Sequence, residues 1–415
     1  MIETRLPAEL VGLICKAAAE AEEKGYRLYL VGGVVRDLLL EKVSFDIDLA
    51  VEGDAIGLAR SLSGVTGGKL LVHERFNTAK IKSDKWVMDI ATCRSETYAR
   101  PGALPTIRPG SLRDDMARRD FTINAMAVRL NPAVFGELVD PYGGLNDLKQ
   151  RFIRILHDNS FTYDATRIWR AVRYEQRLDF NIEAHTLGLL KRDIDRLETI
   201  SGDRIRHEME LVLSEHQPEK RLHRAYELGV LQKVHSSLKG DAWLVQKYQR
   251  AREILSSEQL NASLNWGILV CRLQEAEVVQ LISYLKLPRP ITDVARDSVR
   301  VRLVLEKLKN NRLKQSRIYA LLSAFSPAAV KVNEIVTEDE TLRNKLDLYL
   351  NTLRNVKPAL NGKDLAVLGI AAGPRMQEIL DILRDARLDG EVEGRAQEKA
   401  LVERWLLKSN AGGGD

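Results

Sequence analysis

The sequence predicts an α+β protein in which a small mixed β-sheet comes first and all-helical domains follow. Residues 29–49 (YLVGGVVRDLLLEKVSFDIDL) have the pattern of a strand, a glycine turn, a short helix, a loop and a second strand. From residue 180 onward the apolar residues instead follow helical spacing, as in Ile205, Met209 and Val212. Segments rich in Val, Ile and Leu predict three more strands, at 69–73, 76–82 and 85–91.

Size and composition indicate a globular protein of two to four domains. The chain has 415 residues, of which 45% are hydrophobic and 29% charged, and its net charge of +5 permits a polyanionic partner without requiring one. Cys15, Cys93 and Cys271 are far apart and fit neither a disulfide framework nor zinc spacing, so we expect a reducing cytoplasm. The sequence has no secretory pattern and no run of about eighteen apolar residues, which predicts a soluble intracellular protein.

The stretch at 29–49 carries the first candidate site. Asp46 and Asp48 are two residues apart on a predicted strand, so their side chains point to the same face. Neighbouring carboxylates raise each other's pKa unless a cation lies between them, which is how a Mg²⁺ pair is held for nucleotidyl transfer. Gly32 and Gly33 allow backbone N–H groups to approach a ligand closely, and Arg36 on the following helix adds a donor for phosphate oxygens.

The order of these features is more informative than any one of them. An Asp-x-Asp pair alone is typical of a solvated strand face, and Gly-Gly before a helix is typical of a simple turn. Together, GGVVRDLLL and FDIDLAVEG resemble the nucleotidyltransferase superfamily that includes DNA polymerase beta, and more closely the bacterial-type (class II) CCA-adding tRNA nucleotidyltransferase and poly(A) polymerase family. A dinucleotide-binding site is not indicated, because the sequence has no G-x-G-x-x-G.

The resemblance implies a domain organisation. We expect a DNA polymerase beta-like catalytic head, then a helical neck with a nucleotide-selecting helix, a helical body and a helical RNA-binding tail. Their expected bounds are 1–156, 157–235, 236–355 and 356–415.

Asp89 is a third candidate catalytic carboxylate. It lies in KWVMDIATCRSETY, where DIATCRSETY resembles the family's DIAT-x-R-x-E-x-Y segment. A role in a metal site and a strand-end Asp bonded to backbone amides are both open. Residues 94–115 hold three prolines and two glycines and form no single regular element, and the resemblance implies a flexible segment there that reshapes the nucleotide site between CTP and ATP addition.

The segment RRDFTINAMA resembles the family's RRDxTINAxA motif. The resemblance implies that Arg119 contacts the nucleotide phosphates or sugar, although adjacent arginines are most often solvated. FTINAMAV is an apolar run that predicts a strand, and residues 139–156 predict a turn, a helix and a final strand that close the head.

The helix predicted within FTYDATRIWRAVRYEQRLDF is the candidate for base selection. Asp164 and Arg167 would lie one turn apart on one face, where a carboxylate beside a guanidinium complements the Watson–Crick edges of cytosine and adenine and disfavours uracil and guanine. The alternative is an ordinary surface salt bridge. The segment resembles the family's EDxxRxxRAxRF motif, with Tyr163 in place of the family's Glu. The match also nominates Arg170, about 60° further round the helix, and Arg173, which helical geometry places on nearly the opposite side.

The C-terminal segment 360–392 resembles the family's tail motif. Gly362 and Lys363 precede a helix that could present N–H groups to RNA phosphates, and a capped helix in a packed bundle is the equal alternative.

The sequence therefore predicts a template-independent, Mg²⁺-dependent nucleotidyltransferase. It would add CMP, AMP or both to the 3′ end of tRNA from CTP and ATP, in the synthesis and repair of CCA ends. A poly(A) polymerase of the same family, and an enzyme that adds only CC or only A, would share these motifs. An RNA-binding protein without catalytic activity is the non-enzyme alternative, which intact Asp46 and Asp48 disfavour.

Overall fold

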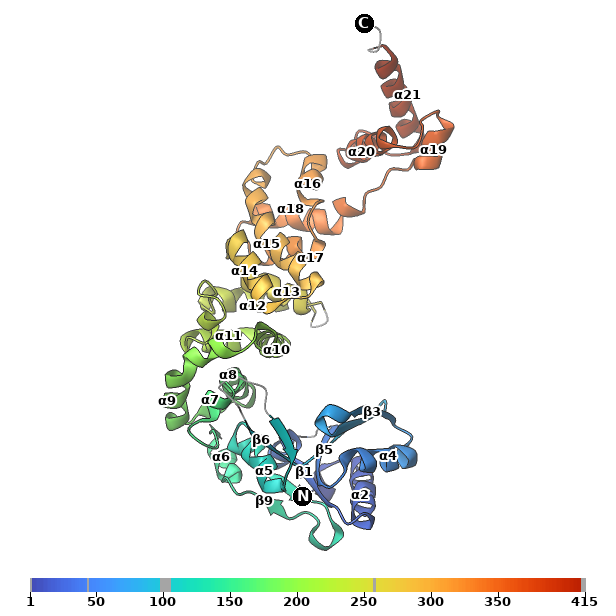
Figure 1. The fold of residues 1–415 in the computed structure, drawn as a ribbon. Helices are drawn as coiled ribbons and strands as arrows, with labels where there is room; N and C mark the ends of the chain where they lie inside the picture. The colour runs from blue at the N-terminus through green and yellow to red at the C-terminus, as the bar shows by residue number, and fades with distance from the viewer. Residues whose placement is uncertain (1, 43–44, 98–105, 257–258, 412–415) are drawn as a thin grey trace. The chain divides into compact units, whose positions relative to one another are not determined.

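The computed structural model describes residues 2–42, 45–97, 106–256 and 259–411 (Figure 1). The chain divides into two compact units, which we describe separately. The first unit comprises residues 1–208 and 227–233, and the second comprises residues 209–226 and 234–415. The finer division into head, neck, body and tail stays a prediction.

A mixed sheet forms the centre of the first unit, as the sequence predicts, and seven strands of the described residues make it up. The strands lie in the order β3-β4-β5-β2-β1-β8-β9, and β2 and β5 are parallel while the other neighbours are antiparallel. Their bounds are β1 Arg27–Val31, β2 Asp46–Glu52, β3 Lys69–His73, β4 Thr78–Lys82, β5 Val87–Thr92, β8 Ala127–Arg129 and β9 Leu138–Val139. Two further pairs of strands are β6 Arg94–Thr97 with β7 Thr106–Pro109, and β10 Phe152–Ile153 with β11 Asn181–Ile182.

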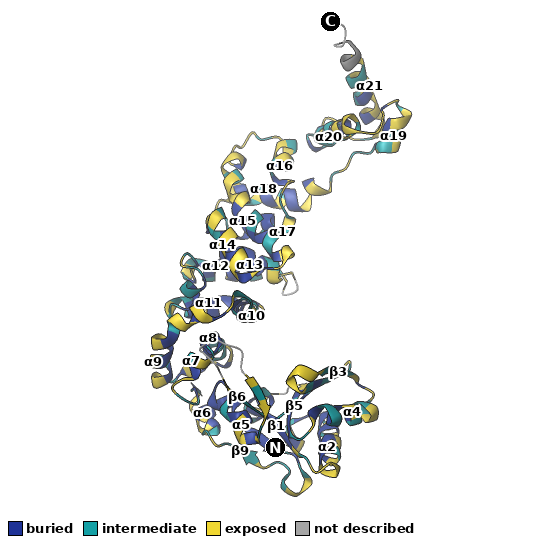
Figure 2. Cartoon of the chain, in the orientation of Figure 1, coloured by how far each residue is buried: buried dark blue, intermediate teal, exposed yellow. Residues whose placement is uncertain are grey.

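The helices of the first unit cover the sheet unequally. Helix α4 packs on β4 and β5, and Ile47 of β2, Ile81 of β4 and Ile90 of β5 are buried on one face of the sheet. Figure 2 shows these elements coloured by burial. On the opposite face, α5 packs Leu112 and Met116 near β1 and β2 but leaves the Asp46 end of β2 exposed. The α-helices of this unit are α1 Ile2–Arg5, α2 Ala8–Glu23, α3 Gly33–Leu39, α4 Ala55–Thr66, α5 Leu112–Ala117, α6 Gly144–Gln150, α7 Ser160–Tyr163, α8 Thr166–Leu178, α9 Ala184–Asp193 and the first half of α10 Gly202–Leu213.

The predicted strand over FTINAMAV is only partly correct. Its first half is a 3₁₀ turn, η2 Thr122–Asn124, and only Ala127–Arg129 form a strand, β8. The Asp120 carboxylate accepts from the backbone N–H of Phe121 and from Asn124 Nδ2, at 2.8 and 3.0 Å. These side-chain bonds offer the backbone an alternative to a sheet ladder, and they close the turn.

The second unit is helical, as predicted. One apolar cluster includes Val301, Leu322 and Leu346, and another includes Leu365, Leu383 and Val402. None of the helices in the described part of the chain is both long and apolar enough to cross a membrane. Besides the second half of α10, the α-helices are α11 Pro218–Glu227, α12 Ala242–Ile254, α13 Ala262–Val270, α14 Glu275–Leu285, α15 Arg289–Leu308, α16 Gln315–Leu322, α17 Pro327–Val336, α18 Glu340–Asn351, α19 Gly362–Val367, α20 Pro374–Leu388 and α21 Arg395–Ala411.

Candidate active site

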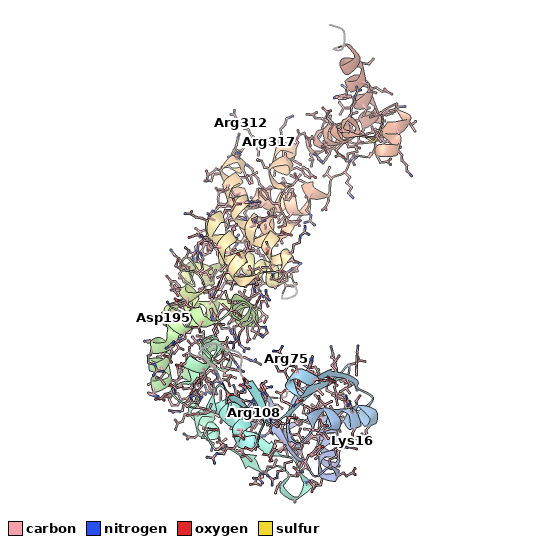
Figure 3. All side chains as sticks on the ribbon, viewed as in Figure 1. Lys16, Arg75, Arg108, Asp195, Arg312 and Arg317 are labelled. Carbon is pink, nitrogen blue, oxygen red and sulfur yellow. The ribbon has the colours of Figure 1, made fainter. Side chains whose placement is uncertain are left out.

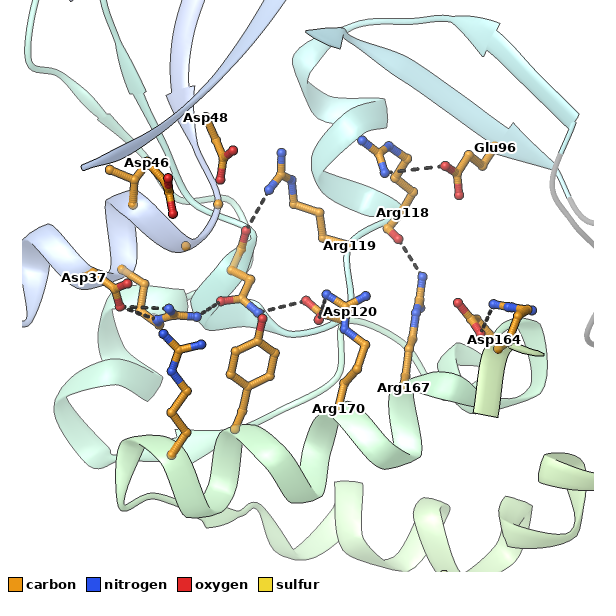
Figure 4. A pocket seen from close by; sticks show the side chains of 18 residues that line it. Asp37, Asp46, Asp48, Glu96, Arg118, Arg119, Asp120, Asp164, Arg167 and Arg170 are labelled. Carbon is orange, nitrogen blue, oxygen red and sulfur yellow. Dashed lines mark hydrogen bonds and ion pairs between the residues drawn. The ribbon is translucent and has the colours of Figure 1, made fainter. Parts of the chain in front are cut away.

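A polar cavity of about 580 Å³ lies in the first unit, beside the exposed end of β2 (Figure 4). Most of the residues nominated from the sequence line it. From the turn before α3 and from β2 come Gly32, Gly33, Arg36, Asp46 and Asp48; from the segment after α5 come Arg118, Arg119, Asp120 and Asn124; and from the helical side come Asp164, Arg167, Arg170, Tyr174, Arg177 and Arg204.

The acidic side of the cavity is made by β2. Asp46 and Asp48 both line the cavity, because alternate residues of a strand share a face. Burial, together with the negative charges of Asp89 and Asp46, raises the pKa of Asp48 to about 6, although Arg119 and Lys80 act in the opposite sense. A carboxylate held among other carboxylates in this way has the donor chemistry that a hard divalent cation requires.

Asp89 lies beside this pair but not on the cavity wall. It stands directly opposite Asp48 in the parallel β2–β5 ladder, and its Oδ2 atom is 3.1 Å from Lys80 Nζ. In the described part of the chain, no group of three His, Cys, Asp or Glu side chains is arranged to hold a metal ion. A catalytic role for Asp89 stays a prediction.

The glycine turn leaves space for the guanidinium group of Arg119 close to Asp48. Gly32 has φ of +75°, and a Cβ atom added there would lie 2.8 Å from Arg119 Nη1 and 3.9 Å from Asp48 Oδ2. Gly32 is therefore needed both for its backbone conformation and for the space that Arg119 occupies. Arg36 is buried and donates to Asn124 Oδ1 at 2.7 Å and to Asp37 Oδ1 at 2.9 Å, so its guanidinium is held rigidly under the cavity.

Arg119 is fixed by Asp115 on α5. Its Nη2 atom donates to Asp115 Oδ2 at 2.9 Å, and Nη1 donates to the carbonyl of Asn124 at 3.3 Å. Burial alone would raise the pKa of Asp115, but Arg118 and Arg119 outweigh it and hold that pKa below its usual value. The Asp115 carboxylate is thus charged at neutral pH and keeps Arg119 in place.

The predicted pair of Asp164 and Arg167 on one helix face is wrong. Asp164 has an extended backbone between α7 and α8, and its Oδ1 accepts from Thr166 N at 3.1 Å and Thr166 Oγ1 at 2.7 Å, capping the start of α8. Its ion-pair partner is Arg204 on α10, whose Nη2 is 2.7 Å from the same Oδ1. Arg167 is buried and instead donates to Ser160 Oγ and to the carbonyl of Arg118, both at 2.6 Å. Both residues still line the cavity.

Arg170 and Arg173 occupy different environments on α8. Arg170 lines the cavity and pairs with the buried Asp120 at 2.6 Å. Burial would raise the pKa of Asp120, but Arg170 and the bond from Asn124 lower it overall. Arg173 does not line the cavity; its guanidinium lies 3.8 Å from Glu208 and 5.2 Å from the centre of the Tyr174 ring. The structure therefore brings Arg170 to the site and leaves Arg173 outside it, as helical geometry indicates.

The tail residues Gly362 and Lys363 lie in the second unit, at the start of α19. The N–H group of Lys363 already donates to Asn361 Oδ1 at 2.9 Å within a capping box completed by Asp364. The capped-helix alternative thus describes the N–H group of Lys363, and contact of Gly362 and Lys363 with RNA stays a prediction.

Comparisons with known proteins identify the family. The chain matches the poly A polymerase head domain over residues 28–154, and the probable RNA- and SrmB-binding site of polymerase A over residues 179–240. An A-adding tRNA nucleotidyltransferase of Halalkalibacterium halodurans is 33% identical, over 92% of this chain and 90% of the relative. This chain belongs to the tRNA nucleotidyltransferase and poly(A) polymerase family.

Other members of the family show the same likeness. An A-adding tRNA nucleotidyltransferase of Geobacter sulfurreducens is 34% identical over 97% of this chain, and the chain spans only about half (48%) of that relative's length. A solved CCA-adding enzyme in complex with ATP has a TM-score of 0.82 and 29% identity, with 98% of this chain and 97% of that chain covered. A Thermotoga maritima CCA-adding enzyme complexed with tRNA has a TM-score of 0.76 and 29% identity, with 97% of each chain covered.

Several cavity residues were not predicted in this tRNA nucleotidyltransferase family member. Tyr174 and Arg177 continue the stripe begun by Arg167 and Arg170, since spacings of three, four and three residues keep one face of a helix, so periodicity alone would have found them. Asp120 lies inside the RRDFTINAMA motif and carries a charge that the fold buries. Arg204 is 40 residues from Asp164 in the sequence, and no local pattern indicates that the two meet.

Proposed function

We propose that this chain is a template-independent nucleotidyltransferase that adds nucleotides to the 3′ end of tRNA, with CTP or ATP as donor and pyrophosphate as product. One observation carries the proposal: two carboxylates on one face of β2 share a cavity with a glycine turn and with Asp164. The family relatives are named for such reactions, and three of the solved structures are complexes with ATP, CTP and tRNA, respectively. We place the reaction in the cytoplasm because all three cysteines are free thiols.

The acidic side of the cavity fits a divalent metal. Asp46 and Asp48 would hold Mg²⁺ ions that activate the RNA 3′-hydroxyl and stabilise the departing pyrophosphate. With a pKa of about 6, Asp48 is mostly ionised at neutral pH and can act as a ligand. Asp89 would support the charge of this site from the neighbouring strand.

The triphosphate would lie between the glycine turn and Arg119. Gly32 and Gly33 line the cavity at the N-terminal end of α3, and Arg119 supplies a fixed positive charge beside them. Arg36 braces the turn from below, because its guanidinium is held by Asp37 and Asn124.

The base would be read by Asp164 with a guanidinium partner. All described hydrogen bonds of this carboxylate use Oδ1, so Oδ2 is available to accept from the exocyclic amine of cytosine or adenine. Arg204 is the guanidinium that touches Asp164, whereas Arg167 is engaged with Ser160 and Arg118. We therefore propose that Arg204 donates the hydrogen bond to the ring nitrogen of the base, and that Arg167 holds the start of α8 against the head. A uracil or guanine would place an acceptor against Asp164 and is disfavoured.

Addition of the terminal A alone is the narrower form of the proposal. The A-adding relatives are 33–34% identical over 85–97% of this chain, whereas full-length CCA-adding relatives are 26–29% identical over 90–94%. A decisive assay uses tRNAs that lack one, two or three 3′ nucleotides, each with CTP, ATP or both. Extension only of the tRNA ending in CC, by one A, supports A-addition; extension of all three to CCA supports the full reaction. A long A tail points to a poly(A) polymerase, and no extension of any tRNA contradicts the proposal.

A further inference from the structure

The β3–β4 hairpin (residues 69–82) presents basic side chains on the same face of the sheet as the catalytic carboxylates. In the ladders, Asp48 is opposite Asp89, Asp89 is opposite Lys80, and Lys80 is opposite Leu71. Residues directly opposite one another share a face, so these four side chains form one row across β2, β5, β4 and β3. The adjacent row on that face runs from Asp46 through Val87 and Lys82 to Lys69.

Lys69 and Lys82 carry positive charge that the fold does not neutralise. Both are exposed, and neither has an ion pair with any other residue that the structure describes. They are directly opposite each other in the antiparallel β3–β4 ladder, an arrangement of like charges that destabilises a sheet. Lys80 is different, because its ammonium group is paired with Asp89. The two outer lysines are therefore free to bind an anion, which would relieve their repulsion.

The same strip of sheet also exposes apolar surface. Leu71 lies in the row of Asp48 and is 44% exposed. Phe76, in the turn η1 Glu74–Phe76 that joins β3 to β4, is 45% exposed beside the guanidinium of Arg75, which Figure 3 labels. An exposed leucine beside unneutralised lysines, with an exposed aromatic ring at the other end of the same hairpin, offers apolar groups for contacts with bases and positive charge for contacts with phosphates.

The hairpin surface is close enough to Asp48 for one RNA strand to contact both. Three steps between neighbouring strands separate Leu71 from Asp48, which at roughly 4.8 Å a step places them about 14 Å apart. An RNA whose 3′-hydroxyl reaches Asp48 can thus lay its preceding single-stranded nucleotides over β5, β4 and β3. Val87 and Ala91, the neighbours of Asp89 on that face of β5, leave this path without bulky side chains.

We propose that Lys69, Leu71 and Lys82 form a basic sheet face that binds the backbone and bases of the single-stranded 3′ segment of the RNA substrate. The proposal rests on the proposed function for the identity of the RNA. On this proposal, the hairpin contributes to the affinity for RNA and does not contribute to the binding of the nucleotide. Because backbone contacts are read without regard to sequence, this share would be the same for every tRNA.

The test compares Lys69→Ala/Lys82→Ala with a matched control, Lys16→Ala/Lys24→Ala. The control removes two exposed lysines at α2 and its C-cap, on a separate part of the head (Lys16 is labelled in Figure 3). Binding is measured by fluorescence anisotropy for two RNA hairpins, one with a short single-stranded 3′ extension and one with a blunt end. KM for tRNA and for ATP is measured in the transfer assay.

The hairpin variant should bind the extended RNA roughly tenfold more weakly than the wild type. The slope of the logarithm of its binding constant against the logarithm of salt concentration should be smaller in magnitude by about two, because two phosphate contacts are lost. Binding of the blunt RNA and KM for ATP should stay unchanged. The control should match the wild type throughout. Equal loss for extended and blunt RNA, or no loss beyond the control, overturns the proposal. The binding measurements do not depend on catalysis. If the wild-type protein transfers no nucleotide, the proposed function is contradicted, but the binding measurements still test whether the hairpin binds RNA. Thermal unfolding should show no loss of stability, since a repulsive pair is removed.

Discussion

On the β2 side of the cavity, Asp48 lies beside the carboxylates of Asp46 and Asp89, whereas on the α8 side Arg170 is paired with the buried carboxylate of Asp120. Burial and like charge raise the pKa of Asp48 to about 6, but Arg170 and Asn124 hold the pKa of Asp120 below its usual value. On the helix side, Arg170 and Asp120 neutralise each other and form a frame. The strand side keeps an excess of negative charge, which is what a site reserved for divalent cations requires.

Removing a charge from the strand side should have the largest effect on activity. Asp48→Asn should lower nucleotide transfer by roughly a thousandfold or more, because a metal ligand is lost. The same variant should be more stable than the wild type without metal, by about 2 kcal/mol at neutral pH, since the raised pKa shows that folding disfavours the ionised form. Urea unfolding and single-turnover transfer measure the two effects. The exposed Asp84→Asn is the control, and a destabilised, active Asp48→Asn protein would contradict this picture.

Removing a charge from the helix side should instead unfold the frame. Arg170→Gln leaves the buried Asp120 carboxylate without its counter-charge, and the expected loss of stability is about 3–5 kcal/mol. Urea unfolding of Asp120→Asn, Arg170→Gln and the double variant measures it. The double variant should recover part of the loss, because it leaves no unpaired charge. Strictly additive losses would show that the two side chains are not coupled.

Base selection should depend on Arg204 more than on Arg167. Arg204→Ala should reduce discrimination for ATP and CTP over GTP and UTP by roughly tenfold, because Asp164 loses its guanidinium neighbour. Arg167→Ala should chiefly lower stability, since Arg167 joins Ser160 to the carbonyl of Arg118. Single-turnover rates with each of the four nucleotides, read beside unfolding curves, separate the two. If Arg167→Ala reduced nucleotide discrimination and Arg204→Ala only lowered stability, Arg167 would be the residue that reads the base.

The pH dependence of stability offers a smaller test. The folded-state pKa of Asp48 is raised from 3.8 to about 6, so its contribution to stability is present at low pH and is lost as pH rises through that window. The stability difference between Asp48→Asn and the wild type should therefore grow between about pH 4 and pH 6 and then level off. Transfer activity should rise as the pH increases through about 6, where Asp48 ionises in the folded protein. A pH-independent difference would show that Asp48 is not held in this way.

Local patterns predicted the strand side well and the helix side poorly. The alternation of a strand fixes the shared face of Asp46 and Asp48 wherever the strand lies. On the helix side, the start of α8 was misplaced, because Thr166 and Asp164 form a cap that lengthens the loop before the helix. Asp164 pairs with Arg204, and Arg167 donates to the carbonyl of Arg118. Both partners are distant in the sequence, so only the tertiary fold determines these contacts. The predicted switching segment falls partly on residues 98–105, outside the described residues.

Metal-linked stability tests the central claim most directly. Thermal unfolding of the wild type and of Asp46→Asn/Asp48→Asn is followed as MgCl₂ or MnCl₂ is added, at constant ionic strength and pH above 7. Metal that binds only the folded state must raise its stability, so the wild type should gain stability with metal concentration and the double variant should not. Equal responses of the two proteins, or no response of the wild type even with nucleotide present, would contradict the account.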